Sequence, residues 1–282
     1  MKRMILWAVV AVLGVNVAWA DGLADKGRQV LGKNQDAVVA IRVVLKVGMS
    51  MGGQTAPKRD QKIETTGVVI DPSGLIVASY ATVDPTESLK SVYGAAMTQR
   101  GGRAEDMVIE TEITDLKIVF GDQSEMAGQV VLRDADLDLA FIRPTEKPAQ
   151  PLAAVDLTQH AKLQILDEVV VLNRLGKVGN RVSAVSLGRI EAILNKPRTF
   201  YVLGQTTWGY SFGAPVFALD GKVAGLILLR NTKADLDTTR GFLFDNLCKF
   251  GMMPVILPAE DIQEAAKNAP ATAPAPTPKP AE

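Results

Sequence analysis

Residues 63–83 read IETTGVVIDPSGLIVASYATV, and this stretch decides the fold. Two apolar runs rich in valine and isoleucine, 63–70 and 75–83, flank the tetrapeptide Asp71–Gly74 (DPSG). Proline in the second position and glycine in the fourth are typical of a β-turn. The stretch therefore predicts two antiparallel strands joined by a tight turn.

The same pattern continues along most of the chain. Short apolar runs separated by turn residues recur from Val38 to Phe244, and few segments have a helical period. The dipeptide Asp220-Gly221 between two such runs indicates a further hairpin. The segment Pro144–Pro151 holds three prolines and predicts a connector, because proline lacks the N–H that a sheet ladder requires. We therefore expect an all-β fold of two small barrels side by side.

This organisation divides the chain into five parts. They are a signal peptide (1–20), a first barrel (21–143), a connector (144–151), a second barrel with a C-terminal helix (152–268) and a disordered Pro/Ala tail (269–282). We expect a short helix at 21–35 and long loops at 48–61 and 85–106, the second with some helix. Glu260 and Asp261, placed after Pro258, favour a closing helix near Ala259–Lys267.

The first twenty residues are typical of an export signal. Lys2 and Arg3 precede the uncharged apolar run Met4–Val17, and Ala18-Trp19-Ala20 resembles a cleavage site. A membrane anchor is the alternative, but the run is shorter than the roughly 20 residues that a spanning helix needs. We therefore expect an exported protein, periplasmic or secreted, that begins at Asp21 and has no stable membrane span.

Composition excludes several classes of function. The chain has 31 Lys+Arg, 31 Asp+Glu, one His and one Cys. Balanced charge argues against a nucleic-acid partner. A single Cys cannot form an intramolecular disulfide, and one His with one Cys cannot supply the ligands of a usual zinc site. We expect no metal and no cofactor, and we interpret Cys248, in the apolar stretch 241–250, as a buried, inert thiol.

Three segments together resemble the HtrA/Deg (DegP-like) branch of the trypsin-like serine proteases. Thr66–Val83 resembles the family's glycine–strand–turn–strand that ends in Thr-Asn-Asn-His-Val-Val. Asp134–Ile142 (DADLDLAFI) is similar to Asp-x-x-x-Asp-Leu-Ala-Val-Leu. Gly213–Phe217 (GAPVF), with Asp220–Leu226 (DGKVAGL) after it, is similar to Gly-Asn-Ser-Gly-Gly-Pro-Val and the following hairpin. The resemblance implies two six-stranded antiparallel barrels, and the family's C-terminal peptide-binding domain has no counterpart in this sequence.

The resemblance also implies that the catalytic triad is not intact. The family's histidine falls on Ala81, its aspartate on Asp138 and its serine on Phe212. A triad needs an imidazole as base, a carboxylate to orient it and a hydroxyl to attack. Alanine supplies no base and phenylalanine no nucleophile. We expect Asp138 to have a structural role, and conservation of volume predicts that the Phe212 ring fills the space left above Ala81.

An active enzyme is the main alternative. A shift of one residue would make Ser211 a stand-in nucleophile, which would still require a base. The only imidazole, His160, lies in a polar loop before the strand at Asp167 and is expected away from the cleft. Ser211 is otherwise interpreted as a turn hydroxyl.

Three functions therefore remain open at this point. The first is a catalytically inactive pseudoprotease that binds an extended peptide or an unfolded protein in the old cleft or at a sheet edge, with a regulatory role. The second is a serine endopeptidase that uses Ser211. The third is a structural envelope component that interacts through its long loops or its tail. The sequence leaves homo-oligomers open.

Overall fold

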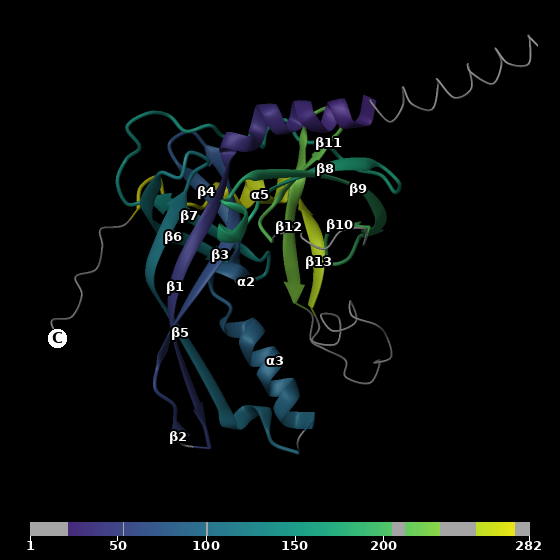
Figure 1. The fold of residues 1–282 in the computed structure, drawn as a ribbon. Coiled ribbons are helices and arrows are strands. Elements are labelled where there is room, and N and C mark those ends of the chain that lie inside the picture. Colours follow the sequence, from purple (N-terminus) through teal and green to yellow (C-terminus); the bar gives the residue numbers. More distant parts are fainter. Residues whose placement is uncertain (1–21, 53, 100, 205–211, 232–251, 274–282) are drawn as a thin grey trace, which may run out of the picture.

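A computed structural model describes residues 22–52, 54–99, 101–204, 212–231 and 252–273. They form two antiparallel β-barrels that lie side by side (Figure 1). Six strands close each barrel, and a short helix, α5 (Ala259–Ala266), follows the last strand. The predicted fold class is confirmed.

The first barrel is closed by its longest strands. Its strands are β1 (Val38–Met51), β2 (Gln54–Thr55), β3 (Arg59–Asp71), β4 (Leu75–Ser79), β5 (Met107–Val119), β6 (Glu125–Asp134) and β7 (Leu139–Pro144). The order is β2-β1-β3-β4-β7-β6-β5, and pairing of β1 with β5 closes the barrel and leaves β2 outside it. Fully buried β-branched and leucine side chains such as Ile41, Leu45 and Ile142 fill the interior.

The second barrel repeats this plan with shorter strands. Its strands are β8 (Glu168–Arg174), β9 (Ser183–Leu194), β10 (Phe200–Leu203), β11 (Pro215–Ala218), β12 (Val223–Asn231) and β13 (Met252–Pro258). They close in the order β10-β13-β12-β11-β8-β9. Alternate residues face opposite sides of a strand. Accordingly, Val169 and Val171 of β8 fill the barrel, whereas Val170 and Leu172 join a second cluster shared with the first barrel.

The turn that opened the sequence analysis forms as predicted. β3 and β4 pair antiparallel around Asp71–Gly74. The backbone N–H of Gly74 donates to the Asp71 carbonyl at 2.9 Å, and that of Ser73 donates to the Asp71 carboxylate at 2.7 Å. The glycine at the fourth position adopts φ +99°, a value that favours glycine.

Both expected long loops prove to be largely regular structure. Residues 48–51 continue β1, and residues 59–61 begin β3, so that this hairpin and β5 extend below the barrel as an arm (Figure 1). Within 85–106, Thr86–Gln99 form helix α3, and the 3-10 helix η2 is Ala104–Asp106. Hydrogen bonds to neighbouring strands stabilise the strand segments despite their weak local propensity for strand. A search for apolar alternation along the sequence does not detect such segments.

A carboxylate fixes the start of α3. The Asp84 carboxylate accepts hydrogen bonds from the Thr86 hydroxyl at 2.6 Å and from the Thr111 hydroxyl of β5 at 2.7 Å. It also accepts from the Thr86 backbone N–H at 3.3 Å. The short helical turn α2 (Tyr80–Val83) therefore leads into α3 beside the junction of the barrels.

Buried arginines join the two barrels. Arg174, at the end of β8, is 6% exposed and donates to the carbonyls of Val38 (2.7 Å) and Gln35 (2.9 Å), at the start of the first barrel. Gln35 belongs to the 3-10 helix η1 (Gln35–Ala37), which continues a helix at residues 22–34. These bonds tie the start of β1 to the end of β8, so loss of the guanidinium would remove a direct connection between the barrels.

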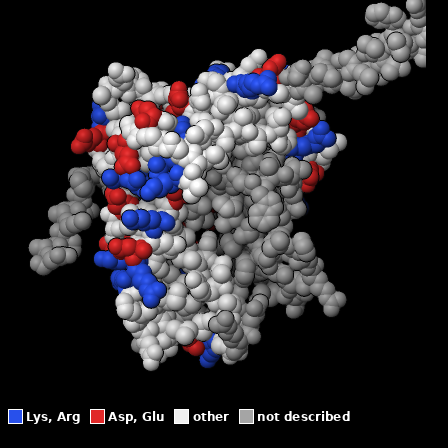
Figure 2. Space-filling model, viewed as in Figure 1, with Lys and Arg blue, Asp and Glu red and all other residues white. Residues whose placement is uncertain are grey.

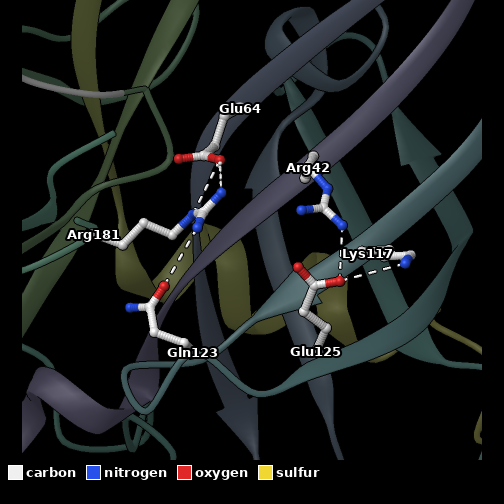
Figure 3. Close-up of polar contacts among 6 residues, drawn as sticks. All are labelled: Arg42, Glu64, Lys117, Gln123, Glu125 and Arg181. Atoms are coloured by element: carbon white, nitrogen blue, oxygen red, sulfur yellow. Dashed lines mark hydrogen bonds and ion pairs between the residues drawn. The ribbon is translucent and has the colours of Figure 1, made fainter. Parts of the chain in front are cut away.

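Arg181 adds a second connection (Figure 3). It follows the 3-10 helix η3 (Lys177–Gly179), and its guanidinium donates to the Glu64 carboxylate of β3 at 2.7 Å and to Gln123 at 3.3 Å. Arg42 and Lys117 share Glu125 in the same view, at 2.8 and 3.3 Å.

Charges of both signs alternate on the first-barrel strands at the left of the space-filling view (Figure 2). Neither sign forms a continuous patch on that side of this face, as expected of a solvated surface. In the described ranges, no helix has the length and apolar character needed to cross a membrane. The predicted signal peptide, Cys248 and residues 274–282 of the predicted tail lie outside the described residues.

Candidate functional site

The three triad positions lie on separate elements near the junction of the barrels. Ala81 is in α2, directly after β4, Asp138 is in the turn before β7, and Phe212 precedes β11. Asp138 has φ +58°, a conformation that aspartate tolerates better than most residues. Its carbonyl accepts the Tyr80 N–H at 2.9 Å, which holds α2 against this turn.

The Asp138 carboxylate accepts hydrogen bonds from three groups of the protein in the described ranges. Its Oδ1 accepts the backbone N–H of Ala81 at 2.6 Å. Its Oδ2 accepts the Ser79 hydroxyl and the backbone N–H of Leu229, both at 2.7 Å. Leu229 belongs to β12, so this carboxylate links the first barrel to the second. Sequence reasoning expected backbone donors here but did not identify Ser79 or Leu229.

Burial dominates the ionisation of this carboxyl group. Asp138 is 7% exposed. Desolvation raises its pKa to about 6, while the bonds from Ala81, Ser79 and Leu229 act in the opposite direction. The group is therefore mostly ionised at neutral pH, where a carboxylate is the matching acceptor for three donors.

This raised pKa predicts a pH-dependent stability. In the unfolded chain Asp138 ionises near 3.8, but in the folded chain only near 6. Stability due to this group is therefore fully present below pH 3.8 and falls as the pH rises to about 6. Between pH 4 and 7 the wild type should lose up to about 3 kcal/mol of unfolding free energy relative to Asp138→Asn, measured by urea denaturation. A free-energy gap that does not change with pH would contradict the assignment.

Phe212, the predicted nucleophile position, lies in the turn before β11. Its carbonyl accepts the Thr65 hydroxyl at 3.1 Å. Its side chain packs against the core cluster of the second barrel, which includes Val216 and Ile227. Its ring therefore extends that core, and the expected exchange of volume with Ala81 stays a prediction. Ser211, the stand-in nucleophile of the alternative, lies outside the described residues.

The imidazole of His160 lies beside α5. Its Nδ1 is 3.2 Å from the Leu157 carbonyl oxygen, and its Nε2 is 3.9 Å from a Glu260 carboxylate oxygen. A single bridge pairs His160 with Val223 of β12. The structure does not bring it to the carboxylate of Asp138. Among the described residues, no three His, Cys, Asp or Glu side chains gather in a way that could hold a metal ion.

A cavity of about 500 Å³ opens at the junction. From the first barrel it is lined by Tyr80, Ala81 and Asp138, and from the second by Phe200, Leu228 and Val255. The last three are buried apolar side chains, so the second-barrel wall is largely apolar. Sequence reasoning placed the cleft but did not identify these lining residues, because they come from strands far apart in the chain.

Two antiparallel six-stranded barrels, with an aspartate at their junction and a cavity beside it, define a protein of the trypsin-like class. Residues 65–226 match the model of the trypsin-like peptidase domain, which is more than half of the chain. The chain belongs to this family. No curated protein matches the sequence.

Proposed function

We propose that this chain is an exported, catalytically inactive member of the HtrA/Deg branch that binds an extended peptide or an unfolded protein in the cavity between its barrels. The observation that carries the proposal is the bonding of Asp138. In the described part of the chain it accepts from Ser79, Ala81 and Leu229 and so connects the barrels, and the alanine at position 81 gives it no imidazole to orient. Phe212, which the resemblance aligns with the family's nucleophile, has no hydroxyl.

The cavity favours side-chain recognition over full strand addition. The Leu229 N–H of β12 already donates to Asp138, so it is not available to a peptide that pairs with this edge. A ligand would gain affinity by burying its apolar side chains in the cavity, where the lining residues Tyr80, Ala81 and Leu137 are only partly buried. This argument supports binding of extended chains with exposed apolar side chains, such as those of unfolded proteins.

Blocking the cavity tests this function. Fluorescent casein should bind to residues 21–282, measured by fluorescence anisotropy, and Ala81→Trp should weaken binding by about tenfold or more, since a ring displaces roughly one buried ligand side chain. The bond from Ala81 to Asp138 uses a backbone N–H and is retained in this variant.

Ala127→Trp is the matched control, because Ala127 is exposed on β6 and does not line the cavity. Equal loss in both variants, or no binding by the wild type, would contradict the proposal. Capture of a partner that requires only the Pro/Ala tail would support the structural-component alternative.

A further inference from the structure

The two walls of the cavity carry opposite charges. The first-barrel side contributes Asp84, Glu87 and Asp136, and the second-barrel side contributes Arg198 and Arg230. A ligand between these walls experiences a field directed across the cavity. Its charged groups are therefore sorted by sign, and an anionic group is stabilised only at the second-barrel wall.

Both arginines line the cavity, and within the described ranges each lies close to another side chain. The Arg230 guanidinium lies over the Phe200 ring, 5.0 Å from its centroid. Stacking on a ring leaves the N–H groups in the guanidinium plane free to donate. Arg198, two residues before Phe200, has a side chain 42% exposed and is 3.7 Å from the Asp261 carboxylate, beyond hydrogen-bond distance.

The acids of the opposite wall are more strongly committed. Asp84 accepts from Thr86 and Thr111 at 2.6 and 2.7 Å. Glu87 is 2.8 Å from the Lys90 ammonium. Two of the three acids on this wall therefore have partners of their own, and Asp136 is exposed.

We infer that this cavity selects extended peptides that carry a carboxylate, held by Arg198 and Arg230. The inference rests on the proposed peptide-binding function and names its ligand class. Guanidinium–carboxylate bonds are charge-assisted and stronger than neutral ones. Phe200 lines the cavity beneath Arg230 and is itself buried at 6% exposure, so it fixes the position of the guanidinium that stacks on it.

Matched peptides test the inference. One probe has the sequence Val-Ala-Val-Glu-Val-Ala, with both ends blocked and an uncharged dye, and its twins carry Gln or Lys in place of Glu. Anisotropy with residues 21–282 should show the Glu peptide binding at least about tenfold tighter than the Gln peptide. The Lys peptide should bind no better than the Gln peptide.

Variants of this wall should remove the preference. Arg198→Gln should reduce the Glu-to-Gln ratio, and Arg198→Gln with Arg230→Gln should bring it near one, while Arg230→Lys should retain part of it. Arg189→Gln is the control. Arg189 lies on β9, pairs with Glu168 of β8 and does not line the cavity. The side chain of Arg198 is exposed, so its single variant reports on selectivity even where changes at Arg230 affect folding.

The outcomes separate this inference from the function on which it rests. Casein binding with equal affinity for the Glu and Gln peptides overturns the carboxylate preference and leaves the peptide-binding function standing. A preference that survives the double arginine variant also overturns it. Absence of binding to casein and to every peptide overturns both.

Discussion

Proteolysis by the wild-type chain should be at background, and neither Ala81→His nor Phe212→Ser alone should raise it. The first variant gains a base without a nucleophile, and the second gains a nucleophile without a base. In subtilisin, loss of the serine or histidine alone costs roughly a millionfold in kcat, about as much as loss of the whole triad. We therefore expect measurable cleavage of fluorescent casein only from the double variant.

The geometry at Asp138 limits even the double variant. Its Oδ2 already accepts the Ser79 hydroxyl and the Leu229 N–H, so a new imidazole N–H would compete with them. Adding Ser79→Ala to the double variant removes one competitor and should increase its rate. Wild-type proteolysis that disappears on Ser211→Ala would overturn the inactive assignment and favour the displaced-nucleophile enzyme. Labelling of the wild type by a fluorophosphonate would also favour the displaced-nucleophile enzyme.

Gly213→Ala should destabilise the protein by at least about 4 kcal/mol, enough to unfold many domains. Gly213 has φ +86°, and a Cβ built there would lie 2.1 Å from the Thr66 carbonyl oxygen of β3. Its N–H donates to the Ile227 carbonyl at 2.7 Å, so the turn cannot move away without losing that bond. Urea denaturation, or the yield of folded protein, measures the effect.

Gly221→Ala is the matched control for backbone strain. Gly221 has nearly the same conformation, φ +83°, but a Cβ there meets nothing within 4 Å. This variant should cost only the roughly 1–2 kcal/mol of the left-handed conformation. If both variants lost a similar amount of unfolding free energy, the close approach of the barrels at Gly213 would not be the reason that glycine is required there.

Local patterns in the sequence predicted the elements whose signals are local. The turn Asp71–Gly74 and the dipeptide Asp220-Gly221 specify their hairpins through residues that fit the required dihedral angles. The hairpin at 48–61 was not predicted, and at 85–106 only some helix was expected where Thr86–Gln99 is helical. Both segments form against β5 and have weak periodicity of their own. Their stability comes from partners distant in the chain.

The sequence by itself determined that the chain is a two-barrel β protein. Its resemblance to the family predicts alanine and phenylalanine at two triad positions, and residue identity decides which proton transfers are chemically available. Only the tertiary structure decided what the remaining aspartate does. Ser79 and Leu229 reach Asp138 from different strands, and burial between two barrels raises its pKa. The opposing charges at Asp136 and Arg230 likewise face one cavity only because separate barrels supply its walls. Hydrogen bonds and fields act through space, and distance along the chain does not reveal them.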